Sequence, residues 1–167
     1  MSSEKKKAVF LDRDGVINEE RGQYTWKVDD FRINAGVVEA LLKLQSAGYL
    51  LIVVSNQGGI AKGFYSKDEV EKLHKWMIER LAAADIYITE VYYCPHHPDQ
   101  GNCICRKPQS LLLEKACARF GIEAAHSWFI GDAQRDEEAG KAAGVRTVLI
   151  HPNEDLCPVA DKILGAV

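Results

Sequence analysis

Short, mostly apolar runs alternate with longer amphipathic segments along most of the chain. The short runs occupy positions 8–11, 49–54, 88–93, 127–130 and 145–150. Between them, segments such as 37–47 space apolar residues three and four positions apart, which is typical of an amphipathic helix. Apolar strands that alternate with such helices are typical of a parallel sheet covered on both faces. The pattern predicts an α/β fold, a three-layer Rossmann-like parallel sheet.

Several helix ends can be predicted from single residues. The helix over 37–47 should close at Gly48, and the helix over 66–84 should begin at Ser66, where Glu69 completes a capping box. A further helix should run from about Ser110 to about Gly121. No repeat, low-complexity tract or Pro/Gly/Ser-rich linker divides the sequence, so we expect one domain over 1–167; no element is assigned from position 151 onward.

Composition and charge exclude several classes of protein. The chain has 167 residues, of which 47% are hydrophobic and 27% charged, enough for one sizeable core. Its net charge of −3 provides no basic surface for nucleic acid. No apolar run approaches the roughly 18 residues of a membrane span, and the polar start lacks the apolar stretch of a secretory signal. We expect a cytoplasmic monomer without nucleic-acid or membrane partners.

Polar side chains collect where the predicted strands end. These residues are Asp12 and Asp14 after the first strand, Ser55 and Asn56 after the second, Arg106 and Lys107 in the loop after the third, and Asp132 after the fourth. Parallel sheets bind ligands in the crevice at this edge. Asp12 and Asp14 are two apart on extended backbone, so both can point into the crevice, and Gly15 allows the chain to turn away.

Three carboxylates in one crevice would repel one another unless a cation shares them. Carboxylates with few other ligands suit Mg²⁺. Ser55 and Lys107 add a donor and a positive charge that could neutralise a phosphoryl group, and the amides of 57–59 could add donors. Each residue alone has an ordinary explanation, as a solvated acid, a helix cap or a surface lysine. Together they favour phosphoryl transfer.

Four ordered motifs carry a resemblance to a known family. Asp12-Arg13-Asp14-Gly15, Ser55-Asn56-Gln57, Arg106-Lys107-Pro108 and Gly131-Asp132 resemble the motifs of the haloacid dehalogenase superfamily of phosphohydrolases. The resemblance spans about residues 8–150. More narrowly, 56–63 and 92–98 are similar to the heptose 1,7-bisphosphate phosphatases, whose relatives are the histidinol-phosphate phosphatases.

The resemblance implies a role for each motif residue. Asp12 would be the nucleophile that forms an aspartyl-phosphate, and Asp14 the general acid and then the base for water. Mg²⁺ would be held by Asp12, Asp132 and the backbone carbonyl of Asp14. Ser55 and Lys107 would stabilise the transferring phosphoryl group.

Substrate contacts and the absence of a cap are also implied. Arg106 would contact the second phosphate of a small phosphosugar, and the other candidate contacts are Asn56, Gln57, Arg21, Gly22 and Lys62. About 40 residues separate Asp14 from Ser55 and about 50 separate Ser55 from Lys107, which leaves no room for the cap domain of many relatives. Asp136 has two open interpretations: it orients Lys107, or it is a helix-start acid.

A second metal site is predicted from cysteine and histidine. Three thiolates and one imidazole are a soft set that suits tetrahedral Zn²⁺: Cys94, His96, Cys103 and Cys105. Their spacing is not that of a common zinc finger, so free loop cysteines are the alternative; the match to the zinc loop of the relatives favours the metal. Four ligands close the shell, which predicts a structural zinc that braces the loop carrying Arg106 and Lys107. His97 is the rival to His96, while Cys117 and Cys157 have no assigned role.

Three functions are therefore weighed. The leading one is an Mg²⁺-dependent phosphatase that removes the 7-phosphate of heptose 1,7-bisphosphate. The second keeps the chemistry with histidinol phosphate as substrate, whose amine would favour acidic residues in place of Arg21 and Lys62. The third is a catalytically silent binding protein, which would have no need for the second acid, Asp14.

Overall fold

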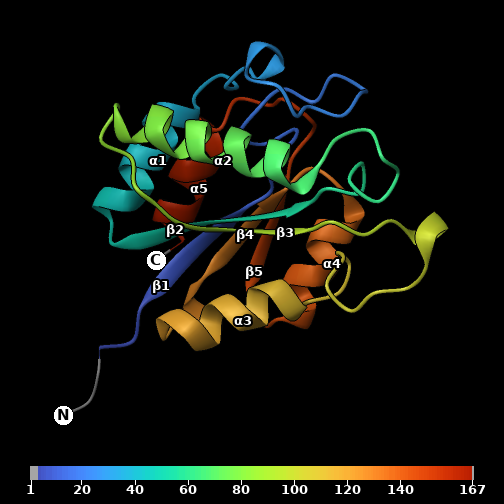
Figure 1. Ribbon diagram of the computed structural model, residues 1–167. Coiled ribbons are helices and arrows are strands. Elements are labelled where there is room, and N and C mark those ends of the chain that lie inside the picture. The colour runs from blue at the N-terminus through green and yellow to red at the C-terminus, as the bar shows by residue number, and fades with distance from the viewer. Residues whose placement is uncertain (1–3, 167) are drawn as a thin grey trace.

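A five-stranded parallel sheet forms the centre of the molecule, with strand order β3-β2-β1-β4-β5 (Figure 1). The computed structural model describes residues 4–166. The strands are β1 Lys7–Leu11, β2 Tyr49–Asn56, β3 Ile88–Cys94, β4 Trp128–Gly131 and β5 Arg146–Leu149. The helices are α1 Val37–Ser46, α2 Lys67–Ala82, α3 Leu111–Phe120, α4 Gln134–Ala142 and α5 Cys157–Gly165. The predicted parallel α/β fold is confirmed.

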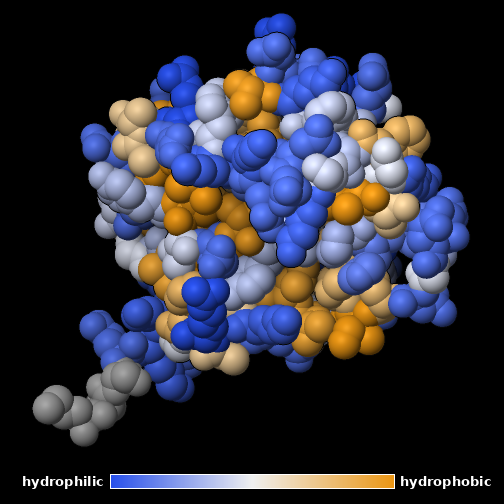
Figure 2. Space-filling view, viewed as in Figure 1, coloured by the Kyte–Doolittle hydropathy of each residue, from blue (hydrophilic) through white to orange (hydrophobic). Residues whose placement is uncertain are grey.

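Helices cover both faces of the sheet, which gives three layers (Figure 1). Val9 and Leu11 of β1 point to the face covered by α1, α2 and α5, and the alternate residues Ala8 and Phe10 point to the face covered by α3 and α4. Burial on both faces explains why β1 is apolar throughout. In Figure 2, polar residues cover much of the visible surface and apolar residues appear in patches between them.

The sequence located the strands and the helices α1, α2 and α3 to within two residues, but it gave no bounds for α4 or α5. Ser66 caps α2 through the predicted capping box, in which Glu69 N donates to Ser66 Oγ at 3.1 Å and Ser66 N donates to Glu69 Oε2 at 2.8 Å. Helix α5 was not predicted; it begins next to Pro158 and packs Ala160 and Ile163 against the core. Within 4–166, no helix is long and apolar enough to cross a bilayer.

The intervals between strands hold little besides the crossover helices. Between β1 and β2 lie a loop, a short 3₁₀ turn and α1, and between β2 and β3 lie a loop and α2. Neither described interval holds an inserted cap, as the sequence predicted. The crevice at the carboxyl edge of the sheet is therefore bordered by loops and by the first turn of α4.

Candidate active site

The predicted catalytic residues meet at the carboxyl edge of the sheet. Asp12 follows β1 directly, and its backbone N donates to Ile130 O of β4 at 3.0 Å. The nucleophile candidate therefore lies at the end of the central strand of the sheet. Ser55 lies inside β2, because this strand continues two residues beyond its predicted end. Lys107 reaches the same place from the loop after β3, and Asp132 from the end of β4.

Lys107 is a buried cation held by two carboxylates. Its Nζ lies 3.0 Å from Asp12 Oδ1 and 2.7 Å from Asp136 Oδ1, and donates to Val54 O at 2.8 Å. Burial opposes the charged form, but the two carboxylates outweigh burial and raise the pKa of Lys107 above its ordinary value. The side chain is therefore a fixed positive charge beside the nucleophile candidate.

The amide of Asn56 fixes the backbone of the Lys107 loop. Lys107 N donates to Asn56 Oδ1 at 3.0 Å, and Asn56 Nδ2 donates to Lys107 O at 3.2 Å. Asn56 was expected to contact substrate, and it does line the cavity described below, but its amide is used by this clamp. The clamp ties the end of β2 to the loop that follows β3.

Three carboxylates form a cluster that suits a divalent cation. Asp12, Asp132 and Asp136 each place an oxygen within 4.8 Å of the others. Burial raises the pKa of Asp12 well above its ordinary value, and the neighbouring acids add to the rise against the opposing charge of Lys107. With all three ionised, Lys107 leaves two negative charges uncompensated. Asp132 Oδ1 is also buried without a hydrogen-bond partner among the described residues. The uncompensated negative charge, the unpaired oxygen of Asp132 and the hard carboxylate donors together fit Mg²⁺.

Gly15 allows this cluster to form. Its φ of 87° is left-handed, and a Cβ at this position would collide with the Asp132 carboxylate. The carboxylate of Asp136 also serves the helix start, because its Oδ2 accepts from the backbone N of Asp132 and of Ala133, each at 3.1 Å. The carboxylate of Asp14 is not part of this cluster. Its predicted contribution through the backbone carbonyl stays a prediction.

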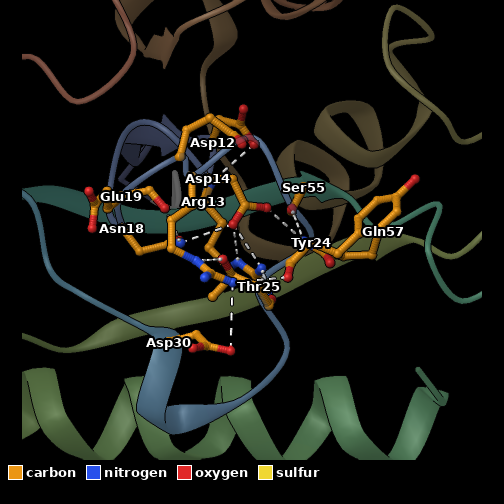
Figure 3. A network of polar contacts seen from close by, with 12 residues as sticks. Asp12, Arg13, Asp14, Asn18, Glu19, Tyr24, Thr25, Asp30, Ser55 and Gln57 are labelled. Carbon is orange, nitrogen blue, oxygen red and sulfur yellow. Dashed lines mark hydrogen bonds and ion pairs between the residues drawn. The ribbon is translucent and has the colours of Figure 1, made fainter. Parts of the chain in front are cut away.

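The carboxylate of Asp14 lies in a neighbouring polar network, which Arg13 N joins to Asp12 Oδ1 (Figure 3). Its Oδ1 accepts from Arg13 Nη2 at 2.8 Å and from Asn18 Nδ2 at 2.9 Å, and its Oδ2 accepts from Gln57 Nε2 at 3.2 Å. Burial alone would raise the pKa of Asp14, but the charge of Arg13 and the hydrogen bonds from Arg13, Asn18 and Gln57 outweigh it and lower the pKa. The surroundings of Asp14 therefore favour its ionised form.

Gln57 connects Asp14 to Ser55. Its Nε2 also donates to Ser55 Oγ at 2.8 Å, and its Oε1 accepts from Tyr65 OH at 2.6 Å. Gln57 is buried and does not line the cavity, so the structure does not support the expected substrate contact of its side chain. Its amide instead holds Ser55 and Asp14 together.

A cavity of about 430 Å³ opens over these residues. Its lining is Asp12, Asp14, Glu20, Gly22, Gln23, Tyr24, Asn56, Gly58, Arg106 and Arg135. Arg106 and Gly22 lie where the sequence placed them. Arg135, from the first turn of α4, was missed, because a charged residue at an exposed helix position usually has no function. Two arginines thus border a cavity whose floor is acidic.

Arg21 and Lys62 do not line this cavity. Arg21 Nη2 lies 3.6 Å from Asp30 Oδ2 and donates to Tyr24 O at 3.3 Å, while Lys62 Nζ lies 3.6 Å from Asp99 Oδ2. Asp30 and Asp99 in nearby loops attract these two cations. The strand-end motifs in the sequence do not predict either ion pair. The expected contact of these two residues with a second phosphate stays a prediction.

The four predicted zinc ligands lie together beside the active site. Cys94 Sγ is 3.7 Å from Cys103 Sγ and 3.0 Å from Cys105 Sγ, and His96 Nδ1 is 3.4 Å from Cys94 Sγ. All four donor atoms lie within 4.8 Å of one another. Corners of a tetrahedron with Zn–S bonds of about 2.3 Å are about 3.8 Å apart, so the cluster fits zinc. His97 Nδ1 instead accepts from Asp99 N at 3.1 Å.

Comparison with known proteins decides the family. The chain is 40% identical to a D-glycero-beta-D-manno-heptose-1,7-bisphosphate 7-phosphatase of Haemophilus ducreyi, over 94% of this chain and 90% of the relative. A relative with the same name from Escherichia coli strain K12 is also 40% identical, over 93% and 84%. The chain belongs to this family of 7-phosphatases within the haloacid dehalogenase superfamily. It is a phosphatase.

Two further comparisons agree with membership in this family. A family model described as HAD-hydrolase-like matches residues 104–155. The crystal structure of D,D-heptose 1.7-bisphosphate phosphatase from B. bronchiseptica, complexed with magnesium and phosphate, superposes with a TM-score of 0.86 at 27% identity, covering 96% of this chain and 99% of that one. Membership in a family of phosphatases disfavours the alternative of a silent binding protein.

Proposed function

We propose that this protein removes the 7-phosphate of D-glycero-D-manno-heptose 1,7-bisphosphate, with Mg²⁺ and through an aspartyl-phosphate on Asp12. The observation that carries this proposal is that Asp12, Asp14 and Lys107 converge below one cavity bordered by Arg106 and Arg135. The names of the relatives support the heptose substrate.

In the first step, a carboxylate oxygen of Asp12 bonds to phosphorus as the bond between phosphorus and the sugar oxygen breaks. The proton that the sugar oxygen needs comes from the carboxyl group of Asp14. Lys107 and the hydroxyl of Ser55 stabilise the charge on the transferring phosphoryl oxygens. Lys107 is suited to this role because its charge is fixed 3.0 Å from the nucleophile.

In the second step, Asp14 takes a proton from water, the water oxygen bonds to phosphorus, and the bond to Asp12 breaks to release phosphate. The lowered pKa of Asp14 suits this second step, in which its carboxylate must be ionised. For the first step Asp14 must hold a proton. A phosphate dianion beside its carboxylate favours protonation, because like charges raise the pKa of an acid.

Asp12, Asp132 and the backbone carbonyl of Asp14 would hold Mg²⁺, consistent with the acidic cluster and the unpaired Asp132 Oδ1. When bound, the ion supplies positive charge that offsets repulsion between the carboxylate nucleophile and the phosphate. Zn²⁺ on the four-residue Cys/His cluster would be structural, because all four positions of a tetrahedral ion would be filled by protein.

The two arginines of the cavity favour a substrate that carries a second phosphate. Arg106 Nη1 donates to His96 O at 3.0 Å, which ties its guanidinium to the zinc loop and directs it over the cavity. Arg135 lies on a different element, at the start of α4. A cation such as the amine of histidinol phosphate is disfavoured beside two arginines, while a phosphate can accept hydrogen bonds from them.

Asp12→Asn tests the proposed chemistry. An amide cannot serve as the nucleophile, so phosphate release should fall to background while the circular dichroism spectrum and Tm stay close to those of the wild type. Asp161→Asn is the matched control, since Asp161 is exposed and pairs with Lys43, far from the acidic cluster in the fold. Substantial phosphate release by a folded Asp12→Asn variant would overturn the nucleophile assignment.

A further inference from the structure

A buried histidine on α2 contacts the catalytic network from outside the cavity. His74 is 5% exposed and lies in the middle of α2, and its Nε2 is 3.0 Å from Arg13 Nη1. We propose that His74 is a positioning residue, which acts through Arg13 to hold the carboxylate of Asp14 in its catalytic orientation. This inference rests on the proposed function, in which Asp14 transfers protons.

The guanidinium of Arg13 is fully buried and has a partner on each side. It donates to Asp14 Oδ1 from Nη2 at 2.8 Å and from Nε at 3.3 Å, and Nη2 also donates to Thr25 O. Nη1 points the other way, to His74. An arginine between Asp12 and Asp14 could adopt several rotamers. Because the buried guanidinium has contacts on opposite sides, these contacts hold it in one rotamer.

The chemistry of the contact determines the state of His74. Arginine has donors only, so His74 Nε2 must accept, and the ring is the neutral tautomer with its proton on Nδ1. Burial, together with the charge of Arg13, lowers the pKa of His74 to about 3, in agreement with a neutral ring. The ring also packs edge-on against Tyr93, with centroids 5.5 Å apart, which restricts its orientation.

The result of this chain of contacts is that the two oxygens of Asp14 have different surroundings. Oδ1 is fixed by Arg13 and Asn18, while Oδ2 has only the 3.2 Å contact from Gln57. Oδ2 is thus the oxygen available for proton transfer at the cavity. Without His74, Arg13 loses the contact opposite Asp14, and the carboxylate keeps only Asn18 as an undisturbed anchor of Oδ1.

Two His74 variants separate positioning from general stability. His74→Leu removes the acceptor, whereas His74→Gln can present an amide oxygen to Arg13. We expect His74→Leu to lower kcat for the sugar bisphosphate by about 10- to 100-fold, the scale associated with a misplacement of about 1 Å, with little change in KM. We expect His74→Gln to recover most of this loss. His126→Leu is the matched control, because His126 is exposed and pairs with Glu123.

A comparison of substrates with different leaving groups distinguishes this positioning role from a purely structural one, which would lower kcat equally for both. Para-nitrophenyl phosphate has a good leaving group and needs little help from an acid, so its kcat should fall much less than that of the sugar phosphate. Equal losses on both substrates, or no loss, would overturn the proposal. If His74→Leu does not fold, His74→Asn replaces it, since its shorter side chain does not reach Arg13. A wild-type protein that hydrolyses neither phosphate would instead overturn the proposed function itself, together with this role.

Discussion

Lys107 Nζ lies 2.7 Å from Asp136 Oδ1, while the other oxygen of the same carboxylate accepts two backbone N–H groups at the start of α4. The sequence left two interpretations of Asp136 open, and the structure contains both arrangements. One carboxylate joins the helix that follows β4 to the lysine that follows β3. The charge beside Asp12 is thereby fixed from α4, the helix whose first turn also places Arg135 at the cavity.

Asp136→Asn separates these two roles. The amide oxygen can still accept from the helix start, but the charge that holds Lys107 is lost. We expect kcat to fall by about 10- to 100-fold through misplacement of Lys107, with a loss of unfolding free energy of about 1–3 kcal/mol, because Lys107 keeps Asp12 as a partner. Asp155→Asn is the control, since Asp155 Oδ1 likewise accepts a backbone N–H at a helix start, that of Cys157 of α5 at 2.9 Å. Equal kcat in the two variants would contradict this role.

Protein purified without chelator should contain one tightly bound zinc per chain. Cys103→Ser should lower the zinc content and reduce activity by up to about 10²-fold, because the loop that carries Lys107 would lose its brace. Elemental analysis and phosphate release measure both effects. Cys117→Ser is the control, since Cys117 lies on α3 outside the cluster. Wild-type protein without zinc would refute the site.

The cavity arginines should discriminate between bisphosphate and monophosphate substrates. Arg106→Ala and Arg135→Ala should each lower kcat/KM for the bisphosphate by about tenfold or more, the scale of a charged hydrogen bond, and change that for a heptose monophosphate much less. Lys62→Ala should leave both values near those of the wild type, since Lys62 pairs with Asp99 outside the cavity. A selective loss in Lys62→Ala, with none in Arg135→Ala, would favour the contact predicted for Lys62 from the sequence and contradict the role proposed for Arg135.

His74 should make folding stability depend on pH. Its pKa is lowered to about 3 in the folded chain, first by burial, while the unfolded chain takes up this proton near pH 6.5. Stability from the neutral ring is therefore full above about pH 6.5 and falls as the pH drops toward 3, by up to about 1.4 kcal/mol per pH unit.

Urea unfolding of wild type and His74→Gln at about pH 7.5 and about pH 5 measures this dependence. The wild type should lose more unfolding free energy than the variant over this interval, because other titrating groups are common to both. His126→Gln should behave as the wild type, since that ring is exposed. Identical losses in all three proteins would show that the buried ring does not oppose protonation.

The strand-end residues were predictable because one physical rule places them. The carboxyl ends of parallel strands share an edge, so Asp12, Ser55 and Asp132 had to approach one another once the fold was recognised. His74 could not be found in this way, because a histidine on the buried face of an amphipathic helix looks like any core residue.

Loop residues were less predictable than strand ends. Arg21 and Lys62 were assigned to the substrate on charge alone, but loop geometry brings Asp30 and Asp99 beside them. Arg135 reaches the cavity only because α4 begins directly after Asp132. Which loop cation borders the cavity depends on backbone paths that the apolar pattern does not specify.

Parallel measurement of phosphate release from heptose 1,7-bisphosphate and from histidinol phosphate tests the central claim most directly. We predict that the bisphosphate loses one phosphate, that on C7, with a kcat/KM at least about tenfold above that for histidinol phosphate, because Arg106 and Arg135 favour a second anion over an amine. A higher kcat/KM for histidinol phosphate, or release of the 1-phosphate in place of the 7-phosphate, would contradict the proposed substrate.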